Sequence, residues 1–440
     1  MSGLIMAAQL IAGLAILVTL HELGHFLAAR AFGIKVEKFY LFFDAWNFKL
    51  FSFKIGDTEY GMGWLPLGGY VKIAGMIDES MDTTQMQQEP QPWEFRSKPA
   101  WQRLIVMVGG IVVNVILGVF IFWMLTFKYG ETYTPIAELK HGIVAYEVAQ
   151  EIGLKTGDKI TEINGKSFEH FEDLLSPKVL LANTTLTVVR DSQTLKITFP
   201  PDFIEHLSTK GKDRFIDKRF TFFIDSVVKG SGADKAGLLK KDIITAVDSL
   251  PIHYFDELQD FLNKHKREDI AITTLRNNDT LKLNAQVDSD GKLGFFSGTN
   301  DYKPATQYYG FAGSFVIGSK RAFSVVTDNL KGFKKIFKGE ISARNSVQGP
   351  VGMAQIYGGH WDWLRFWTIT GLLSMILAFM NILPIPALDG GHMLFLIIES
   401  LTGRKMSDKF MEKAQMVGMI LVLSLMLFAV GNDFVKLFTR

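Results

Sequence analysis

The sequence contains no cysteine among its 440 residues. This absence excludes disulfide bonds, a catalytic thiolate and any cysteine-ligated metal site, so a bound metal would need histidine and carboxylate ligands. An excess of charge of one sign is also missing, because 47 basic side chains stand against 45 acidic ones and the formal net charge is +2. This balance gives no electrostatic reason to expect nucleic acid as a partner.

Charged residues and prolines are scarce compared with apolar residues. Only 21% of the chain is charged and 13 residues are proline, whereas 48% is hydrophobic. The 36 phenylalanines and 40 glycines do not resemble a disordered or low-complexity chain. We therefore expect a folded protein that is partly embedded in a lipid bilayer.

Four uncharged stretches are long enough to cross a membrane as helices. They are Ser2–Leu20, Leu104–Phe127, Phe366–Leu388 and Ala414–Asn432. The first lacks the basic region and small-residue cleavage site of a removed signal peptide, so we expect it to be retained. The third contains Pro384 and Pro386, and we expect its helix to break near the membrane boundary, where loop backbone must face protein or a water-filled cavity.

Basic residues near the helix ends predict the orientation of the chain. They gather after the first span, before the second and between the third and fourth, at Arg30, Lys35, Lys38, Arg96, Lys98, Arg103, Arg404, Lys405, Lys409 and Lys413. We expect these loops in the cytoplasm. Both termini and the segment from Lys128 to Trp361 would then lie outside, which in a bacterium is the periplasm.

The outer segment contains an internal repeat. Residues Gly153, Leu154, Asp158, Ile160, Thr161, Phe171 and Leu174 recur 84 positions later as Gly237, Leu238, Asp242, Ile244, Thr245, Phe255 and Leu258. A constant offset predicts two copies of one domain. Each copy alternates short β-rich runs with turn signals and one helix, which is typical of a small α+β domain.

The second copy resembles the bacterial PDZ pattern over Val227 to Ile244, and the first copy resembles it more weakly. The resemblance implies two tandem PDZ domains. Because PDZ domains generally bind an extended peptide by strand addition, peptides are the ligands it implies. The alternative is a domain that only occupies space above the membrane.

The segment His21-Glu22-Leu23-Gly24-His25 fits the HExxH motif. On a helix this spacing places both imidazoles on one face, where they supply two corners of a tetrahedral zinc site beside Glu22. Asp389 is the candidate third ligand, since it follows the proline break on the same predicted side of the membrane. Ionisable groups at the end of an apolar span indicate a functional site; the alternative is a helix end whose polar groups simply reach water.

Zinc-bound water can attack a carbonyl near neutral pH, with Glu22 taking its proton and returning it to the leaving amine. The residues therefore predict peptide hydrolysis. An ion or proton transporter would also place acids and histidines in broken membrane helices, but it needs neither the HExxH spacing nor peptide-binding domains. A catalytically dead scaffold is the third alternative, and the intact Glu22 speaks against it.

The segment from Asn381 to Gly390 resembles the NxxPxPxLDG motif, and with HExxH it forms the two halves of the site-2 protease signature. The whole chain resembles the bacterial RseP-type branch of this intramembrane zinc metalloprotease family. The resemblance implies one zinc ion per chain, bound by His21, His25 and Asp389, with Glu22 as catalytic acid and base and Asn381 engaging substrate. His392 lies beyond the core motif and is expected to support the site without binding the metal.

The same resemblance implies the biological setting. Family members cut single-pass membrane proteins, typically anti-sigma factors already clipped outside, and remove remnant signal peptides. The expected location is the inner (cytoplasmic) membrane, with the active site near the cytoplasmic side, and the expected process is regulated intramembrane proteolysis.

The first cytoplasmic loop is expected to contain a β-hairpin. Strand-like alternation runs up to Ile55, Gly56-Asp57 supplies a turn, and the segment from Glu59 to Lys72 resembles the membrane-associated β element of the family. Phe39 to Asp44, however, lacks the usual Gly-x-Gly. A hairpin edge could pair with an unwound substrate, so the predicted substrate-binding residues are Gly61, Met62 and Gly63, together with Asn381. The alternative is a hairpin that only anchors the loop at the membrane interface.

Two further segments give weaker signals. Asn114 with Gly109 and Gly110 favours close helix packing over a role in the site. Phe311 to Phe337 mixes apolar and basic residues, which predicts an amphipathic helix on the membrane surface that ends at Gly349 to Gly352.

The predicted fold is a polytopic α-helical membrane protein with four transmembrane helices, one of them broken, a cytoplasmic membrane-associated β-hairpin and two tandem α+β PDZ domains outside. The predicted segments are a first transmembrane helix with the zinc motif at 1–30, a cytoplasmic loop with the hairpin at 31–100, a second transmembrane helix at 101–128, PDZ domains at 131–220 and 221–303, an amphipathic connecting segment at 304–360, a third transmembrane helix with the LDG motif at 361–401 and a fourth at 412–434.

Overall fold

The computed structural model describes all residues except 1, 67, 77–88, 211–213, 340–347 and 439–440. The chain forms two compact units. The first comprises Met1–Gly130, Tyr308–Lys334 and Ser346–Arg440, and the second comprises Glu131–Gln307 and Lys335–Asn345. Residues 340–347 of the predicted connecting segment lie outside the described residues.

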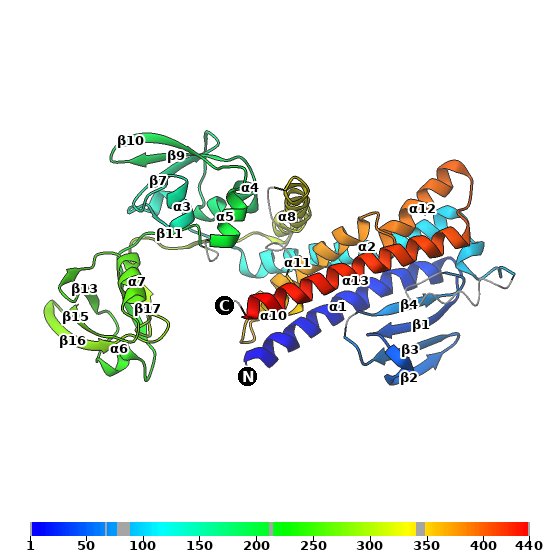
Figure 1. Ribbon diagram of the computed structural model, residues 1–440, viewed down its shortest axis with the longest axis horizontal. Coiled ribbons are helices and arrows are strands. Elements are labelled where there is room, and N and C mark those ends of the chain that lie inside the picture. Colours follow the sequence, from blue (N-terminus) through cyan, green and yellow to red (C-terminus); the bar gives the residue numbers. More distant parts are fainter. Residues whose placement is uncertain (1, 67, 77–88, 211–213, 340–347, 439–440) are drawn as a thin grey trace. The chain divides into compact units, whose positions relative to one another are not determined.

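The first unit is built on four helices that are long and apolar enough to cross a membrane, as the sequence predicts. They are α1 (Ser2–Ala31), α2 (Ala100–Tyr129), α11 (Trp363–Ile382) and α13 (Asp408–Phe438). Helix α2 packs against α1, α11 and α12 (Asp389–Thr402) (Figure 1). Because a Cβ on Gly24 would lie 2.3 Å from Gly109 O, the backbones of α1 and α2 are in direct contact, which small residues allow.

The third predicted span breaks at the prolines, as the sequence predicts. The uncharged run extends to Leu388, and within it α11 ends at Ile382, before Pro384, while α12 begins at Asp389. Leu383 precedes a proline and is extended, with φ −61° and ψ 140°, because a residue before proline is disfavoured in the helical region. The side chain of Gln415 on α13 accepts a hydrogen bond from the Ala387 N–H, so part of the exposed loop backbone is satisfied by protein.

The segment between α1 and α2, predicted to be a cytoplasmic loop, folds into a sheet larger than the predicted hairpin. The expected pair is present, since β2 and β3 are antiparallel on either side of Gly56-Asp57. Two further strands extend it, with β1 parallel to β3 and β4 antiparallel to β1, in the order β2-β3-β1-β4. The strands are β1 (Val36–Leu41), β2 (Lys49–Ile55), β3 (Thr58–Gly63) and β4 (Tyr70–Ile73). The prediction missed β1 because its partner β3 is distant in sequence.

Strand β2 is exposed along its whole length and carries many apolar side chains. Exposed fractions reach 87% at Trp46, just before β2, and 64% at Ile55. Such a continuous apolar surface is rare on a soluble monomer and is typical of a surface that contacts a membrane or another protein.

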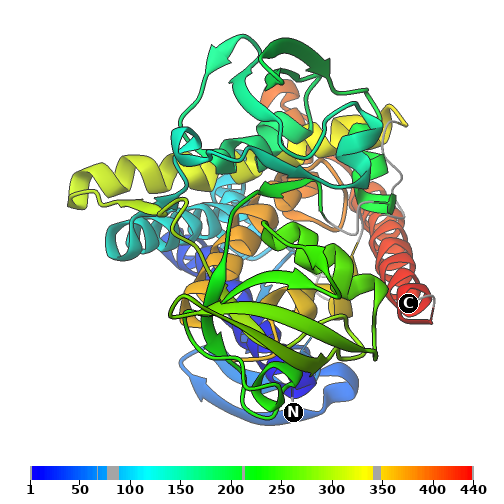
Figure 2. The same cartoon turned by 90° about the vertical axis from the view of Figure 1, so that its left-hand side faces the viewer.

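The second unit contains two modules with the same strand order. The first has the sheet β10-β9-β7-β8 and the pair β6-β11, and the second has the sheet β16-β15-β13-β14 and the pair β12-β17 (Figures 1 and 2). Each module has its own apolar core. Strand β18 (Ala305–Gln307) pairs with β5 (Glu131–Tyr133). The two ends of the segment Glu131–Gln307 are therefore hydrogen-bonded to each other.

The elements of the modules are short. In the first they are β6 (Ile143–Ala145), α3 (Glu147–Glu151), β7 (Lys159–Ile163), β8 (Lys166–Ser167), α4 (Pro177–Leu180), β9 (Thr185–Arg190), β10 (Gln193–Thr198), α5 (Phe203–Lys210) and β11 (Ile216–Lys218). In the second they are β12 (Phe223–Val227), α6 (Gly232–Lys235), β13 (Ile243–Val247), β14 (Leu250–Pro251), α7 (Phe255–Lys264), β15 (Asp269–Arg276), β16 (Asp279–Gln286) and β17 (Phe295–Gly298). Single 3-10 turns lie at Ala45–Asn47, Phe95–Ser97, Ile136–Glu138 and Phe171–Leu175.

The same buried ion pair stabilises both modules. In the first, Arg190 Nε donates to Asp158 at 2.7 Å, and in the second Arg276 Nε donates to Asp242 at 2.8 Å. Each arginine also donates to the carbonyl oxygen of a glycine, Gly153 in the first module and Gly237 in the second. Burial raises the pKa of Asp242, but hydrogen bonds from Arg276 and from the Leu239 N–H outweigh it, so this pKa lies below its usual value.

The predicted amphipathic segment forms α8 (Phe311–Phe337), with the bounds that the sequence suggested. Ala322 on α8 packs with Phe122 on α2 and Met375 on α11. Gly349 to Gly352 does not end α8, contrary to the prediction. Pro350 instead begins α10 (Pro350–Tyr357), where the Asp433 carboxylate accepts the N–H groups of Gly349, Val351 and Gly352.

Candidate metal centre

Three side chains from two helices converge at the proline break. His21 and His25 lie one turn apart on α1, and Asp389 is the first residue of α12. Their facing atoms form a triangle, with His21 Nε2 3.2 Å from His25 Nε2, and Asp389 Oδ2 3.2 Å and 3.4 Å from the two nitrogens. A tetrahedral zinc site with its usual bond lengths requires about 3.3 to 3.5 Å between ligand atoms. The three residues predicted as ligands therefore have the spacing that zinc needs.

The hydrogen bonds around His25 determine which ring nitrogen is available for a metal. Its Nδ1 lies 2.8 Å from the carbonyl oxygen of Val106, which can only accept, so Nδ1 carries the hydrogen. In the neutral ring the lone pair is then on Nε2, which faces Asp389. Lone pairs this close repel one another unless a cation lies between them. The donor set and its arrangement fit a bound zinc ion.

Asn114 on α2 contacts the other histidine, although the sequence favoured a packing role for it. Its side chain is fully buried and its amide lies 3.1 Å from His21 Nδ1. In the present amide orientation, Asn114 Oδ1 has no hydrogen-bond partner in the described part of the chain. With the amide turned by half a rotation, Oδ1 would accept from the His21 Nδ1–H, leaving the lone pair on His21 Nε2 toward the metal. The contact was not predicted because it joins residues on different helices.

Glycines allow α2 to approach the histidines. A Cβ on Gly110 would lie 2.4 Å from His25 Nε2 and 2.6 Å from His21 Cε1. Any other residue at this position would displace the imidazoles. The sequence prediction of close helix packing at Gly109 and Gly110 is confirmed, and the structure adds that the packed surface is the back of the metal centre.

The centre opens into a cavity of about 50 Å³. Glu22 lines this cavity, and so do Val71 and Ile73 of β4. Asn381 Nδ2 lies 3.3 Å from His21 Nε2, so the amide predicted to engage substrate is beside the metal-binding atoms. His392 also lines the cavity and is not one of the three converging groups found among the described residues.

The predicted substrate-binding residues Gly61, Met62 and Gly63 lie elsewhere. They belong to β3, which is hydrogen-bonded to β1 on one side and β2 on the other. A Cβ on Gly61 would lie 2.5 Å from the Tyr40 ring, so this glycine is required by packing within the sheet. None of the three is among the described residues that line the cavity, whereas β4, at the sheet edge, contributes two.

Fold and site together define a zinc metalloprotease with membrane-length helices, and comparison with known proteins agrees. Residues 9–425 match peptidase family M50, and the chain belongs to that family. It is 30% identical over 462 residues to the regulator of sigma E protease of Haemophilus influenzae, covering 99% of this chain and 100% of the relative. The regulator of sigma-E protease RseP of Escherichia coli is 28% identical over 455 residues, covering 98% of each chain.

The name of a third relative includes zinc. A Vibrio cholerae protein that is named a zinc metalloprotease is 27% identical over 457 residues, covering 97% of this chain and 98% of the relative. The predicted zinc dependence is thus confirmed at the level of the family, and the three converging side chains are where this chain could hold the ion.

Proposed function

We propose that this protein is an intramembrane endopeptidase that cleaves the transmembrane segments of single-pass membrane proteins during regulated intramembrane proteolysis. The observation that carries the proposal is the position of the converging side chains, since His21 and His25 lie within a membrane-length helix and Asp389 lies at the break between α11 and α12. Two relatives are named regulators of sigma E, which favours substrates of the anti-sigma factor type in this proposal. Remnant signal peptides are a second proposed class.

His21, His25 and Asp389 bind one zinc ion per chain, and Glu22 is the catalytic acid and base. When bound, zinc supplies a Lewis acid that lowers the pKa of a water molecule and polarises the peptide carbonyl. Glu22 accepts the proton of the attacking water and then donates it to the leaving amine, so that one C–N bond breaks and one C–O bond forms. Asn381 lies beside His21 and orients the substrate carbonyl at the same centre.

Strand β4 supplies hydrogen-bond partners for the backbone of an unwound substrate helix. A transmembrane helix has to expose N–H and C=O groups before it can be cut, and in an apolar site each of them needs a hydrogen-bond partner. Among the described residues β4 pairs with one strand, β1, and so lies at the edge of the sheet, where Val71 and Ile73 line the cavity. Strand addition there would hold an extended substrate. The role of β3, which contains Gly61, Met62 and Gly63, is indirect. Strand β3 pairs with β1, and β1 in turn pairs with β4.

The protein resides in the bacterial inner membrane, with the metal centre near the cytoplasmic side. The clustering of basic residues in the loops after α1, before α2 and before α13 supports this orientation. The two modules of the second unit are tandem PDZ domains in the periplasm. They restrict access by bulky substrates, and peptides are their ligands.

The test is cleavage of a single-span model peptide by the purified protein in liposomes, with and without a zinc chelator. Cleavage within the apolar segment that stops with the chelator and returns with added zinc is the expected result. If the zinc-loaded protein leaves such peptides intact but moves ions or protons across the vesicle membrane, a transporter replaces the protease.

A further inference from the structure

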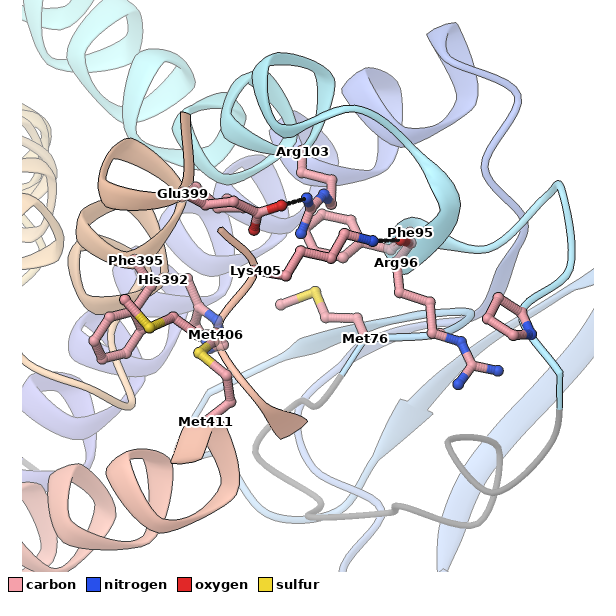
Figure 3. A pocket seen from close by; sticks show the side chains of 13 residues that line it. Met76, Phe95, Arg96, Arg103, His392, Phe395, Glu399, Lys405, Met406 and Met411 are labelled. Atoms are coloured by element: carbon pink, nitrogen blue, oxygen red, sulfur yellow. Dashed lines mark hydrogen bonds and ion pairs between the residues drawn. The ribbon is translucent and has the colours of Figure 1, made fainter. Parts of the chain in front are cut away.

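A second and larger cavity lies next to the metal centre in the same unit. Its volume is about 230 Å³, far above the roughly 15 Å³ that one water molecule needs. Its walls come from Gly75 and Met76 after β4, the segment around Phe95, the first turn of α2, helix α12, the loop that follows it and the beginning of α13 (Figure 3). Two residues, Met76 and His392, line both this cavity and the metal cavity. The two spaces are therefore neighbours that share a wall.

Much of the lining is apolar and adaptable. Met76, Met406 and Met411 contribute to it, together with Phe395 and Leu396 of α12 (Figure 3). Methionine is flexible and polarisable, so it adjusts to apolar groups of different shape. A cavity of this composition favours a large apolar side chain over a small or polar one.

One side of the cavity carries positive charge. Arg103 also lines it, but its guanidinium is paired with Glu399, and Arg96 is paired with Glu94. Lys405 is exposed and donates to the carbonyl oxygen of Arg96 at 2.9 Å, and it has no carboxylate partner in the described part of the chain. An acidic group bound beside the cavity would provide that partner.

Helix α12 gives the distance along its axis between Asp389 and the far wall of this cavity at Leu396. Leu396 follows Asp389 by seven residues on the same helix, which at 1.5 Å per residue is about 10 Å. An extended peptide advances about 3.3 Å per residue, so the same distance corresponds to about three substrate residues. The lining residues also lie toward the helix ends that carry the basic clusters.

We propose that this cavity is a specificity pocket for the substrate, and this inference rests on the proposed protease function. It binds the large apolar side chain, such as Leu, Phe or Met, that lies about three residues from the cut bond on the cytoplasmic side. An acidic residue next to that side chain pairs with Lys405. The pocket thus selects where along an otherwise uniform apolar segment the chain is cut.

The test uses the full-length protein in liposomes and a single-span peptide whose cut bond is mapped by mass spectrometry. Positions two to four on the cytoplasmic side of that bond are changed in turn to Ala, Leu and Phe. The unchanged enzyme is expected to prefer Leu or Phe over Ala about tenfold in kcat/KM at one of these positions. Met411→Trp, which fills the pocket, should bring this ratio close to one, whereas Met416→Trp, an exposed position on the same helix, should leave it unchanged.

Two further variants keep the test decisive if Met411→Trp does not fold. Phe395→Ala enlarges the pocket and should shift the preference toward Trp in the substrate. Lys405→Glu should reverse a preference of roughly two- to fivefold for Asp over Lys beside the apolar residue, and Arg404→Glu, on the same loop but outside the lining, is its control. Zinc content of each variant reports an intact metal centre.

Each outcome separates the pocket from the protease. If the variants cleave with unchanged preference, the pocket proposal is wrong and the protease stands. If preference is unchanged but Lys405→Glu lowers the amount of phosphatidylglycerol that co-purifies with the protein, the cavity belongs to a lipid and the proposal is also overturned. Failure of the unchanged zinc-loaded enzyme to cut any of the peptides would overturn the proposed function itself.

Discussion

The amide of Asn114 lies 3.1 Å from His21 Nδ1, and both side chains are buried between α1 and α2. A histidine that binds a metal through Nε2 carries its hydrogen on Nδ1, and a nearby acceptor holds the ring in that state. This contact makes the second helix part of the metal centre.

Asn114→Leu should weaken zinc binding about 10- to 100-fold, because the imidazole loses the acceptor that orients it. The measurement is the zinc dissociation constant of the purified protein by competition with a chelator. Asn114→Asp keeps an acceptor and should restore most of the affinity, and Val112→Leu, an exposed position on the same helix, is the control. Equal zinc affinity in Asn114→Leu and in the unchanged protein would mean that Asn114 only packs between the helices.

Asp389→Ala should lower zinc occupancy, because it removes one of three protein ligands and leaves two imidazoles. Metal analysis after purification checks this, with Asp279→Ala, an exposed acid of the second unit, as the control. Full zinc content with normal cleavage would show that Asp389 is not a zinc ligand.

Glu22→Gln should keep the metal and lower kcat by about 100- to 10,000-fold, because a carboxamide cannot accept the proton of the attacking water. Zinc content and cleavage of the same model peptide are measured on one preparation. An active Glu22→Gln enzyme would contradict the proposed mechanism.

Deleting Gly142 to Ser297 in frame should leave zinc binding intact and relax selection against substrates with a large folded outer domain. The reason is that the metal centre is built wholly from the first unit. The comparison is between full-length and shortened enzyme on an untrimmed and a trimmed substrate. Loss of both activities with normal zinc content would mean that the modules deliver or activate substrate.

Glu59 should make the sheet between α1 and α2 acid-sensitive in a defined pH range. Its hydrogen bonds from Lys49 and then from Tyr40 lower its pKa from 4.5 to about 2. Because the pKa is lower in the folded state, the stabilisation is present above pH 4.5 and is lost as the pH falls toward 2. The thermal midpoint of the unchanged protein should exceed that of Glu59→Gln at pH 7, and the difference should disappear over this range. A constant difference down to pH 2 would contradict the assignment.

Several features of this protein follow from local sequence alone. Long uncharged runs determine the four membrane-length helices, because length and apolar character suffice for that prediction. The spacing of His21 and His25 places them on one helical face, and Pro384 and Pro386 mark the break that precedes Asp389. These predictions are confirmed because each depends on neighbours within a few residues.

Tertiary structure decided the rest, since it depends on contacts between distant parts of the chain. The parallel pairing of β1 with β3 turned the predicted hairpin into a four-stranded sheet and put β4 at the edge beside the metal cavity. Asn114 reaches His21 only because Gly110 lets α2 lie against α1. The pocket beside Lys405 likewise exists only where several segments distant in sequence meet, and no periodicity or motif encodes such a meeting.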